Sequence, residues 1–187
     1  MGIFDFIKKK NRVNRESHYD ATNIRVTDIE KDYILDYDLD SWIVTKMFEY
    51  DWGNNFFTRE FLINNGKESR YLHIEEGDEI EICVTEKIGI RALGPHIKDI
   101  LQETGKPPGK ITYDNVVYYL DSENPGYYRN VENEDWYEVI SWLYLNEKED
   151  KLIHIEQRGE DEFEATIGIY IEEYKISNIL PQNTDNE

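Results

Sequence analysis

One segment of this chain occurs twice. Aligning residues 61–75 with residues 142–156 gives seven identical positions out of fifteen, far more than unrelated segments share. The identities include the run His-Ile-Glu, which is His73–Glu75 in the first copy and His154–Glu156 in the second. An internal duplication means that one supersecondary unit is built twice, so the two copies constrain the fold together.

Each copy has the period-two alternation of a β-strand, followed by a turn and a second strand. In such a hairpin the strand alternation puts His73 opposite Glu81, and His154 opposite Glu164, on an outward face that meets solvent. The aliphatic residues between them point inward. Both copies therefore predict the same cross-strand His–Glu pair above the same apolar floor.

Period-two patterns with turn signals extend over most of the chain. They predict a mainly β protein of two similar antiparallel meanders, in residues 25–94 and 109–181, which together form a sandwich or a pair of small barrels. The two halves are joined by one short helix over Pro95–Thr104, where proline suits the first turn and Gly105 ends the helix.

The N-terminal residues have a different character. Residues 1–15 carry a net charge of +4, whereas residues 16–187 carry −23. We expect residues 1–24 to form a short amphipathic helix and a polar tether, and residues 182–187 to form a disordered tail. The apolar and basic residues of the helix are Ile3, Phe4, Phe6, Ile7, Lys8, Lys9 and Lys10. This segment could dock on the acidic body, make weak contact with an anionic membrane, or be a leader sequence without a binding role.

Composition excludes several classes of function. An acidic body of this size repels phosphate backbones, which argues against binding of nucleic acid. Cys83 is the only cysteine, so an intramolecular disulfide and a cysteine-rich metal site are excluded. No apolar run is long enough to span a bilayer. A cytoplasmic location follows by default, with peripheral contact at the inner face of the membrane as the further expectation.

The sharpest polar constellation is the repeated His/Glu face. An H-x-E pair on one strand with a carboxylate on the next could supply three ligands to a divalent metal. The candidate ligands are His73, Glu75, Glu81, His154, Glu156 and Glu164. The alternative is a solvated sheet face, which is common, so we predict no bound metal and no cofactor. No catalytic motif is present, and no catalytic residue is predicted.

Aromatic side chains suggest a second candidate site. Trp52, Tyr127, Tyr128 and Trp136 could line a ligand groove, although aromatic residues in strands more often pack in a core. Residues 121–130, "DSENPGYYRN", contain turn-forming residues and two tyrosines, so a loop is expected there and would be the place for such a groove.

Several motifs resemble a bacterial family known as domain of unknown function 4178. In the first half these are "KDYILDYD", "SWIV" and Tyr50-Asp51-Trp52-Gly53, and in the second half "YDNVVYYL", "EQRGEDEFE" and Ile179–Pro181. Two positions depart from the family pattern: Lys31 replaces a glycine and Arg158 replaces a tryptophan. The resemblance covers about residues 30–181. It implies a bacterial protein whose genes often lie near those of small membrane proteins, and it implies no catalytic residues.

These observations favour a non-enzymatic binding or adaptor protein of the bacterial cytoplasm, which contacts a protein or a membrane-associated assembly. The alternative is an enzyme that binds a metal or a small ligand through the His/Glu face. A facing His/Glu set or a deep pocket would favour the second class of function.

Overall fold

The computed structural model describes residues 24–182, and in this part of the chain eleven strands form a single antiparallel sheet. The strands are β1 (Tyr33–Tyr37), β2 (Asp40–Asp51), β3 (Phe57–Asn64), β4 (Ser69–Glu76), β5 (Ile80–Ile88), β6 (Lys110–Tyr113), β7 (Val116–Asn130), β8 (Tyr137–Asn146), β9 (Lys151–Gln157), β10 (Phe163–Ile171) and β11 (Ser177–Pro181). The prediction of a mainly β protein is confirmed. The two halves share one continuous sheet, in place of two packed sheets or two separate barrels.

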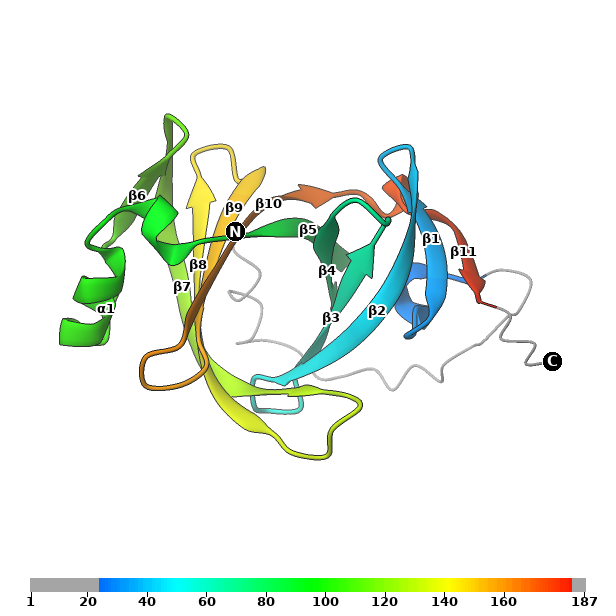
Figure 1. The fold of residues 1–187 in the computed structure, drawn as a ribbon, viewed down its shortest axis with the longest axis horizontal. Coiled ribbons are helices and arrows are strands. Elements are labelled where there is room, and N and C mark those ends of the chain that lie inside the picture. The colour runs from blue at the N-terminus through cyan, green and yellow to red at the C-terminus, as the bar shows by residue number, and fades with distance from the viewer. Residues whose placement is uncertain (1–23, 183–187) are drawn as a thin grey trace.

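The sheet closes on itself. Its order is β11-β1-β2-β3-β4-β5-β10-β9-β8-β7-β6, and a further pairing joins β2 to β7. The strands from β2 to β5 and from β7 to β10 therefore form a ring. Figure 1 shows the strands of the two halves on opposite sides of this ring, with β1 and β11 outside one half and β6 outside the other. The halves meet at two seams, the β5–β10 seam and the β2–β7 seam. The β2–β7 pairing closes the ring, and we call it the closing seam.

The two halves repeat the same series of elements. Each begins with a short strand and a two-residue turn with positive φ at both positions, Asp38-Leu39 in one half and Asp114-Asn115 in the other, which is typical of a hairpin. In each half the long second strand contains a β-bulge. Each fifth strand is followed by a 3-10 turn, η3 (Ile90–Leu93) or η4 (Glu173–Lys175).

The β-bulges allow the two parts of each long strand to pack in different environments. In β2 the bulge lies between Val44 and Lys46, and in β7 it lies between Leu120 and Ser122. A bulge inserts an extra residue and bends the strand, which exchanges the faces on either side of it. The first part of each long strand therefore packs against its own outer hairpin, and the second part faces the interior of the ring.

Three hydrophobic clusters fill this architecture. One cluster lies on the outer face of the first half and includes Trp42 and Phe61. A second lies on the outer face of the other half and includes Trp142 and Tyr144. The third is shared, because it combines Tyr50, Trp52 and Cys83 of the first half with the second-half residues Val139, Leu143, Leu145 and Leu152. Apolar side chains are thus packed on both faces of the ring.

The predicted helix is present and slightly shorter than expected. Helix α1 runs over Ile97–Thr104, and Gly105 ends it with a φ of 67°, the left-handed conformation that glycine adopts readily. Ile97 and Leu101 are buried in the second-half cluster. The described residues also contain the 3-10 turn η2 (Val26–Asp28). The expected N-terminal helix and C-terminal tail lie outside the described residues.

The loop expected at residues 121–130 is wrong, because β7 runs straight through it. Pro125 cannot donate a backbone hydrogen bond, so it suits a strand only where one side is free. It pairs with Ile140 on β8, while the pairing of β7 with β2 begins only at Tyr127. Gly126 follows, at a point where a Cβ would lie 2.7 Å from the carbonyl oxygen of Asp51. The turn-forming residues therefore fit β7 to the closing seam.

Among the described residues, no helix has the length and apolar character needed to cross a membrane.

Candidate functional site

Polar side chains gather on the interior face of the ring. Alternation along the strands points Glu60 of β3, His73 of β4, Ser141 of β8 and His154 of β9 to this side, opposite the outer aliphatic residues. Glu60 is 7% exposed and Ser141 is 0% exposed. Burial of so many polar groups is costly unless they bind one another, so their partners decide what the cluster is.

Arg158 is the centre of this cluster. Its Nε donates to Glu156 Oε2 over 2.6 Å, and its Nη2 donates to the hydroxyl oxygen of Tyr50 over 3.1 Å. Its Nη1 lies 3.3 Å from Glu164 Oε2. The guanidinium also lies over the ring of Tyr128, 4.6 Å from the centroid. One cation thus links carboxylates of the second half to aromatic residues on both sides of the closing seam.

Burial shifts the acid–base behaviour of the cluster. Desolvation, and then the charge of Glu156, raise the pKa of Glu60 to about 8, although Arg158 and a hydrogen bond from Tyr50 oppose the shift. Tyr50 donates that bond to Glu60 Oε1 over 3.2 Å. Desolvation lowers the pKa of His73 to about 4 and also lowers the pKa of His154. Both imidazoles are therefore neutral near pH 7, and Glu60 holds a proton there.

Three residues of the cluster have the order of a hydrolytic triad. Ser141 Oγ lies 2.5 Å from His154 Nε2, and His154 Nδ1 lies 3.8 Å from Glu156 Oε1. Ser141 lies in the middle of strand β8 and is fully buried, so a substrate cannot reach its hydroxyl while the ring is closed. The small cavity beside His154 and Glu156 has a volume of about 10 Å³, roughly the space of one water molecule.

The structure corrects the predicted register of both hairpins. His73 lies opposite Cys83 and His154 lies opposite Thr166, so the two predicted His–Glu pairs are wrong. The observed cross-strand pairs are Glu75–Glu81 and Glu156–Glu164. Each partner strand is offset by two residues from the prediction. Such an offset keeps every side chain on its predicted face, so the hydrophobic pattern could not detect it.

The predicted exposure of this face is also wrong. Glu75 and Glu156 are each 4% exposed, because the sheet curls into a ring and encloses the face expected to meet solvent. Within residues 24–182, no group of three or more His, Cys, Asp and Glu side chains is placed to hold a metal ion. Cys83 is free and buried, and burial raises the pKa of its thiol far above the ordinary value.

The aromatic residues expected to line a groove lie around the closing seam. Trp52 is buried, with its ring stacked on that of Tyr50 at 5.4 Å. Tyr127 is exposed on β7, and the exposed ring of Trp136 lies under the Arg129 guanidinium at 4.8 Å. Tyr128 lies beside Tyr50, with the ring centroids 6.1 Å apart. A groove at these residues stays a prediction.

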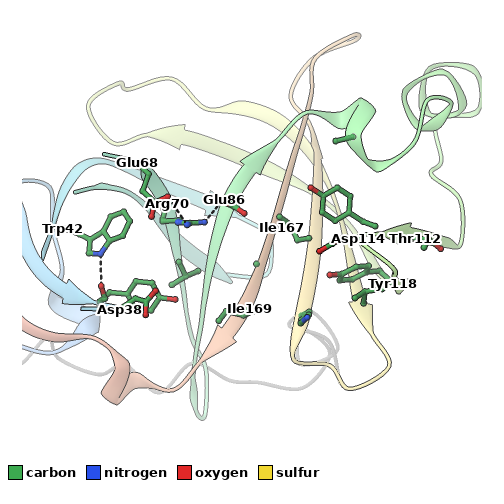
Figure 2. A pocket seen from close by; sticks show the side chains of 17 residues that line it. Asp38, Trp42, Glu68, Arg70, Glu86, Thr112, Asp114, Tyr118, Ile167 and Ile169 are labelled. Carbon is green, nitrogen blue, oxygen red and sulfur yellow. Dashed lines mark hydrogen bonds and ion pairs between the residues drawn. The ribbon is translucent and has the colours of Figure 1, made fainter. Parts of the chain in front are cut away.

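A much larger cavity lies on the outer face of the other seam. This cleft, which we call the seam cleft, has a volume of about 700 Å³ and is floored by Val84 of β5 with Ile167 and Ile169 of β10. Figure 2 shows its two walls, with Trp42 and Asp38 from the first half facing Asp114 and Tyr118 from the second half. Ile169 is 42% exposed, so the floor presents apolar surface to solvent.

The lining of the seam cleft follows the symmetry of the two halves. The equivalent hairpin turns supply one tyrosine and one aspartate to each wall, and other lining positions correspond in the same way. The equivalent pairs are Tyr37 and Tyr113, Asp38 and Asp114, Trp42 and Tyr118, Arg70 and Lys151, and Val84 and Ile167. The cleft therefore has two similar walls across the β5–β10 seam.

Charge in the seam cleft is predominantly negative. Four acidic and two basic side chains line it. Arg70 is engaged by two of the acids, because its guanidinium lies 3.0 Å from Glu68 Oε2 and also contacts Glu86. Asp38 and Asp114 stand on the two hairpin turns as exposed carboxylates. A ligand in this cleft would meet an apolar floor between two acidic corners.

The sequence did not lead us to Arg158, the residue that links the polar cluster. Arg158 lies two positions after Glu156, so alternation alone would have put His154, Glu156 and Arg158 on one face. The same reasoning passed over Glu60, which sits between Thr58 and Leu62 on the interior side of β3. The shared Tyr-Asp pairs at 37–38 and 113–114 were a signal for the seam cleft, because repeated turns at equivalent positions face one another across a symmetry axis.

Comparison with known proteins places the chain in a family. Residues 30–173 match the family described as Domain of unknown function (DUF4178). A curated relative from Aquifex aeolicus (strain VF5), named "Uncharacterized protein", is 28% identical over 183 residues, which cover 97% of this chain and all of the relative. No solved structure matches the chain. Because the family match spans most of the chain and includes both halves of the ring, this protein belongs to the DUF4178 family.

Proposed function

We propose that this protein is a non-enzymatic binding protein and that the seam cleft is its binding site. The observation that carries the proposal is the cleft itself, which combines a volume of about 700 Å³, an exposed apolar floor and acidic corners. Ligand sites typically combine concave apolar surface with a few placed polar groups. The cleft also lies where the two halves meet, and such junctions are a common location for binding sites.

The lining indicates the chemistry of the partner. Aliphatic floor residues favour a ligand with apolar side chains, while Asp38 and Asp114 favour positive charge at both ends. A protein segment that carries lysines between large apolar residues has both properties. We therefore infer that the partner presents such a segment, either in the bacterial cytoplasm or from an assembly at the inner face of the membrane.

The test uses the full chain and a fluorescein-labelled synthetic peptide that contains lysines and large apolar residues. We expect binding by fluorescence anisotropy, and about fivefold weaker binding by the Asp38→Asn/Asp114→Asn variant, because each lost carboxylate removes roughly half a kcal/mol. The matched control is Glu134→Gln/Asp135→Asn, which removes two exposed carboxylates from a turn outside the cleft.

The same experiment can contradict the proposal. A peptide with Glu at every lysine position should not bind. Equal affinity of the cleft variant and the control variant would mean that the cationic peptide recognises the general acidity of the surface, and the seam cleft would lose its assignment.

The alternative function, an enzyme that uses the His/Glu face, is supported by the enclosure of that face inside the ring. The seam cleft does not add to this support, because none of the His/Glu residues of that face lines it. Ser141, His154 and Glu156 lie in the order of a triad inside the ring. A fluorophosphonate probe, which labels activated serines, tests this alternative directly. Stoichiometric labelling that is lost in Ser141→Ala would replace the binding proposal with a hydrolase. We expect no labelling, because the serine is fully buried.

A further inference from the structure

The described part of the chain begins close to the core of the first half. Ile24 packs against the outer hydrophobic cluster of that half. The same cluster includes Trp42 and Val84, and both of these residues also line the seam cleft. The residues that precede Ile24 in the sequence are therefore attached to the half that forms one wall of the cleft.

The preceding residues have the chemistry that the cleft favours. Residues 1–15 carry a net charge of +4, with three consecutive lysines at 8–10, and the apolar residues Ile3, Phe4, Phe6 and Ile7 come directly before them. The cleft offers an apolar floor and a net negative lining. Opposite charge and matched apolar surface thus occur in one chain, in residues 3–10 and in the seam cleft.

The chain is long enough to connect the two. Residues 11–23 separate Lys10 from Ile24, and an extended chain of this length spans roughly 45 Å. A domain of about 160 residues has a radius of gyration of roughly 15 Å. The segment can therefore reach any part of the cleft. A tether of this kind gives a local concentration on the order of millimolar, so modest affinity is sufficient for occupancy.

We propose that residues 3–10 occupy the seam cleft of their own chain and act as an internal competitor for the partner. This inference rests on the proposed function, since it names a second occupant of the same site. The apolar residues lie on the floor formed by Val84, Ile167 and Ile169, and Lys8, Lys9 and Lys10 face the acidic lining. A partner segment of the same chemistry must displace them, which makes binding conditional on a strong or abundant partner.

The first test measures proximity in the full chain. Cys83 is 5% exposed, and burial holds the pKa of its thiol far above the ordinary value, so a cysteine introduced by Phe4→Cys can be spin-labelled selectively. We expect paramagnetic broadening of backbone amide signals at Ile167, Ile169 and Asp114. The broadening should disappear in Asp38→Asn/Asp114→Asn and should remain in Glu134→Gln/Asp135→Asn. Broadening elsewhere, or none, would overturn the inference.

The second test measures competition with the labelled lysine peptide. The full-chain variant Lys8→Glu/Lys9→Glu/Lys10→Glu should bind this peptide about tenfold more tightly than the wild type, because its N-terminal segment is repelled from the acidic lining. Unchanged affinity in this variant would contradict the proposal. Because Asp38→Asn/Asp114→Asn weakens both occupants, its effect on peptide affinity is also measured in the Lys8→Glu/Lys9→Glu/Lys10→Glu background. If the peptide binds through Asp38 and Asp114 there but neither test detects the segment, the binding function stands and the internal competitor fails.

A vesicle co-sedimentation experiment tests whether the segment binds a membrane instead of the cleft. We expect the Asp38→Asn/Asp114→Asn variant to co-sediment with phosphatidylcholine/phosphatidylserine vesicles more strongly than the wild type, since release from the cleft exposes the basic and apolar residues. Substantial and equal co-sedimentation of the two proteins, without broadening at the cleft, would show that the segment is a constitutive membrane contact and would overturn the proposal.

Discussion

Thr85 on β5 lies directly opposite Gly168 on β10, and the two residues hold equivalent positions in the two halves of the chain. The β5–β10 seam is therefore symmetric about this pair. Position 168 of this pair must be glycine. A Cβ on Gly168 would lie 2.0 Å from the carbonyl oxygen of Val84 and 2.7 Å from the Cα of Thr85, distances that atoms cannot adopt without movement of the backbone.

Replacing this glycine should weaken the seam. We expect Gly168→Ala to lower the free energy of unfolding by about 3 kcal/mol or more, because β5 and β10 must separate to make room for the methyl group. Urea denaturation followed by tryptophan fluorescence measures the loss. Gly109→Ala is the control, since a Cβ there meets nothing within 4 Å, and its effect should stay within about 0.5 kcal/mol.

Loss of the central cation should be severe. Arg158→Met leaves Glu156 and Glu164 close together without their shared partner, and we expect destabilisation of about 3–5 kcal/mol. The double variant Arg158→Met/Glu156→Gln should recover part of this loss, because the buried carboxylate is removed as well. If the double variant loses as much free energy of unfolding as the two single variants together, Arg158 and Glu156 do not stabilise each other.

Glu60 should make the protein less stable at alkaline pH. Its pKa is raised to about 8 in the folded chain, so the folded state binds this proton more tightly than the unfolded chain does. The resulting stability is fully present below the ordinary pKa of about 4.5 and is lost as the pH rises through about 8. Relative to the wild type, Glu60→Gln should therefore gain a few kcal/mol between pH 4.5 and pH 9, measured by denaturation at each pH. A pH-independent difference would contradict the assignment.

His73 should produce the opposite dependence. Burial lowers its pKa from 6.5 to about 4, so the unfolded chain binds this proton more tightly than the folded chain does. The contribution is present above pH 6.5 and is lost as the pH falls towards 4, by an amount on the order of 3 kcal/mol. We expect His73→Gln to lose less stability than the wild type between pH 7 and pH 4. NMR titration of the imidazole gives an independent check, and a pKa near 6.5 would refute the burial effect.

Local pattern predicted the strands well, because alternation fixes which residues share a face. It predicted that the aliphatic residues of the two hairpins point into a core, and Leu72, Ile74, Ile153 and Ile155 are indeed buried. It could not fix the hairpin register, since an offset of two residues at His73 or His154 leaves every face unchanged. The turns decide this offset through local geometry that alternation does not encode.

Strand alternation could not predict that the sheet closes into a ring. Pairing of Tyr50 with Tyr128 joins residues that are far apart in the sequence, and no local signal announces it. Without the ring, the face that carries Glu60 and Arg158 is expected to meet solvent, so the buried polar cluster could not be foreseen. The seam cleft depends on the same long-range arrangement, although its Tyr-Asp turns were visible as a repeated pair.

The two seams differ in length, and this difference has a consequence for how the ring assembles and opens. Seven residue pairs join β5 to β10, whereas four pairs join β2 to β7. The shorter seam forms fewer pairs for a loop closure of similar length, so we expect it to form after the longer seam during folding and to exchange its amide hydrogens before it in the native state. Tyr50 belongs to this seam, and its hydroxyl donates to Glu60. We therefore expect transient opening of the seam to give solvent protons access to Glu60, so that the opening rate limits how fast the interior of the ring titrates.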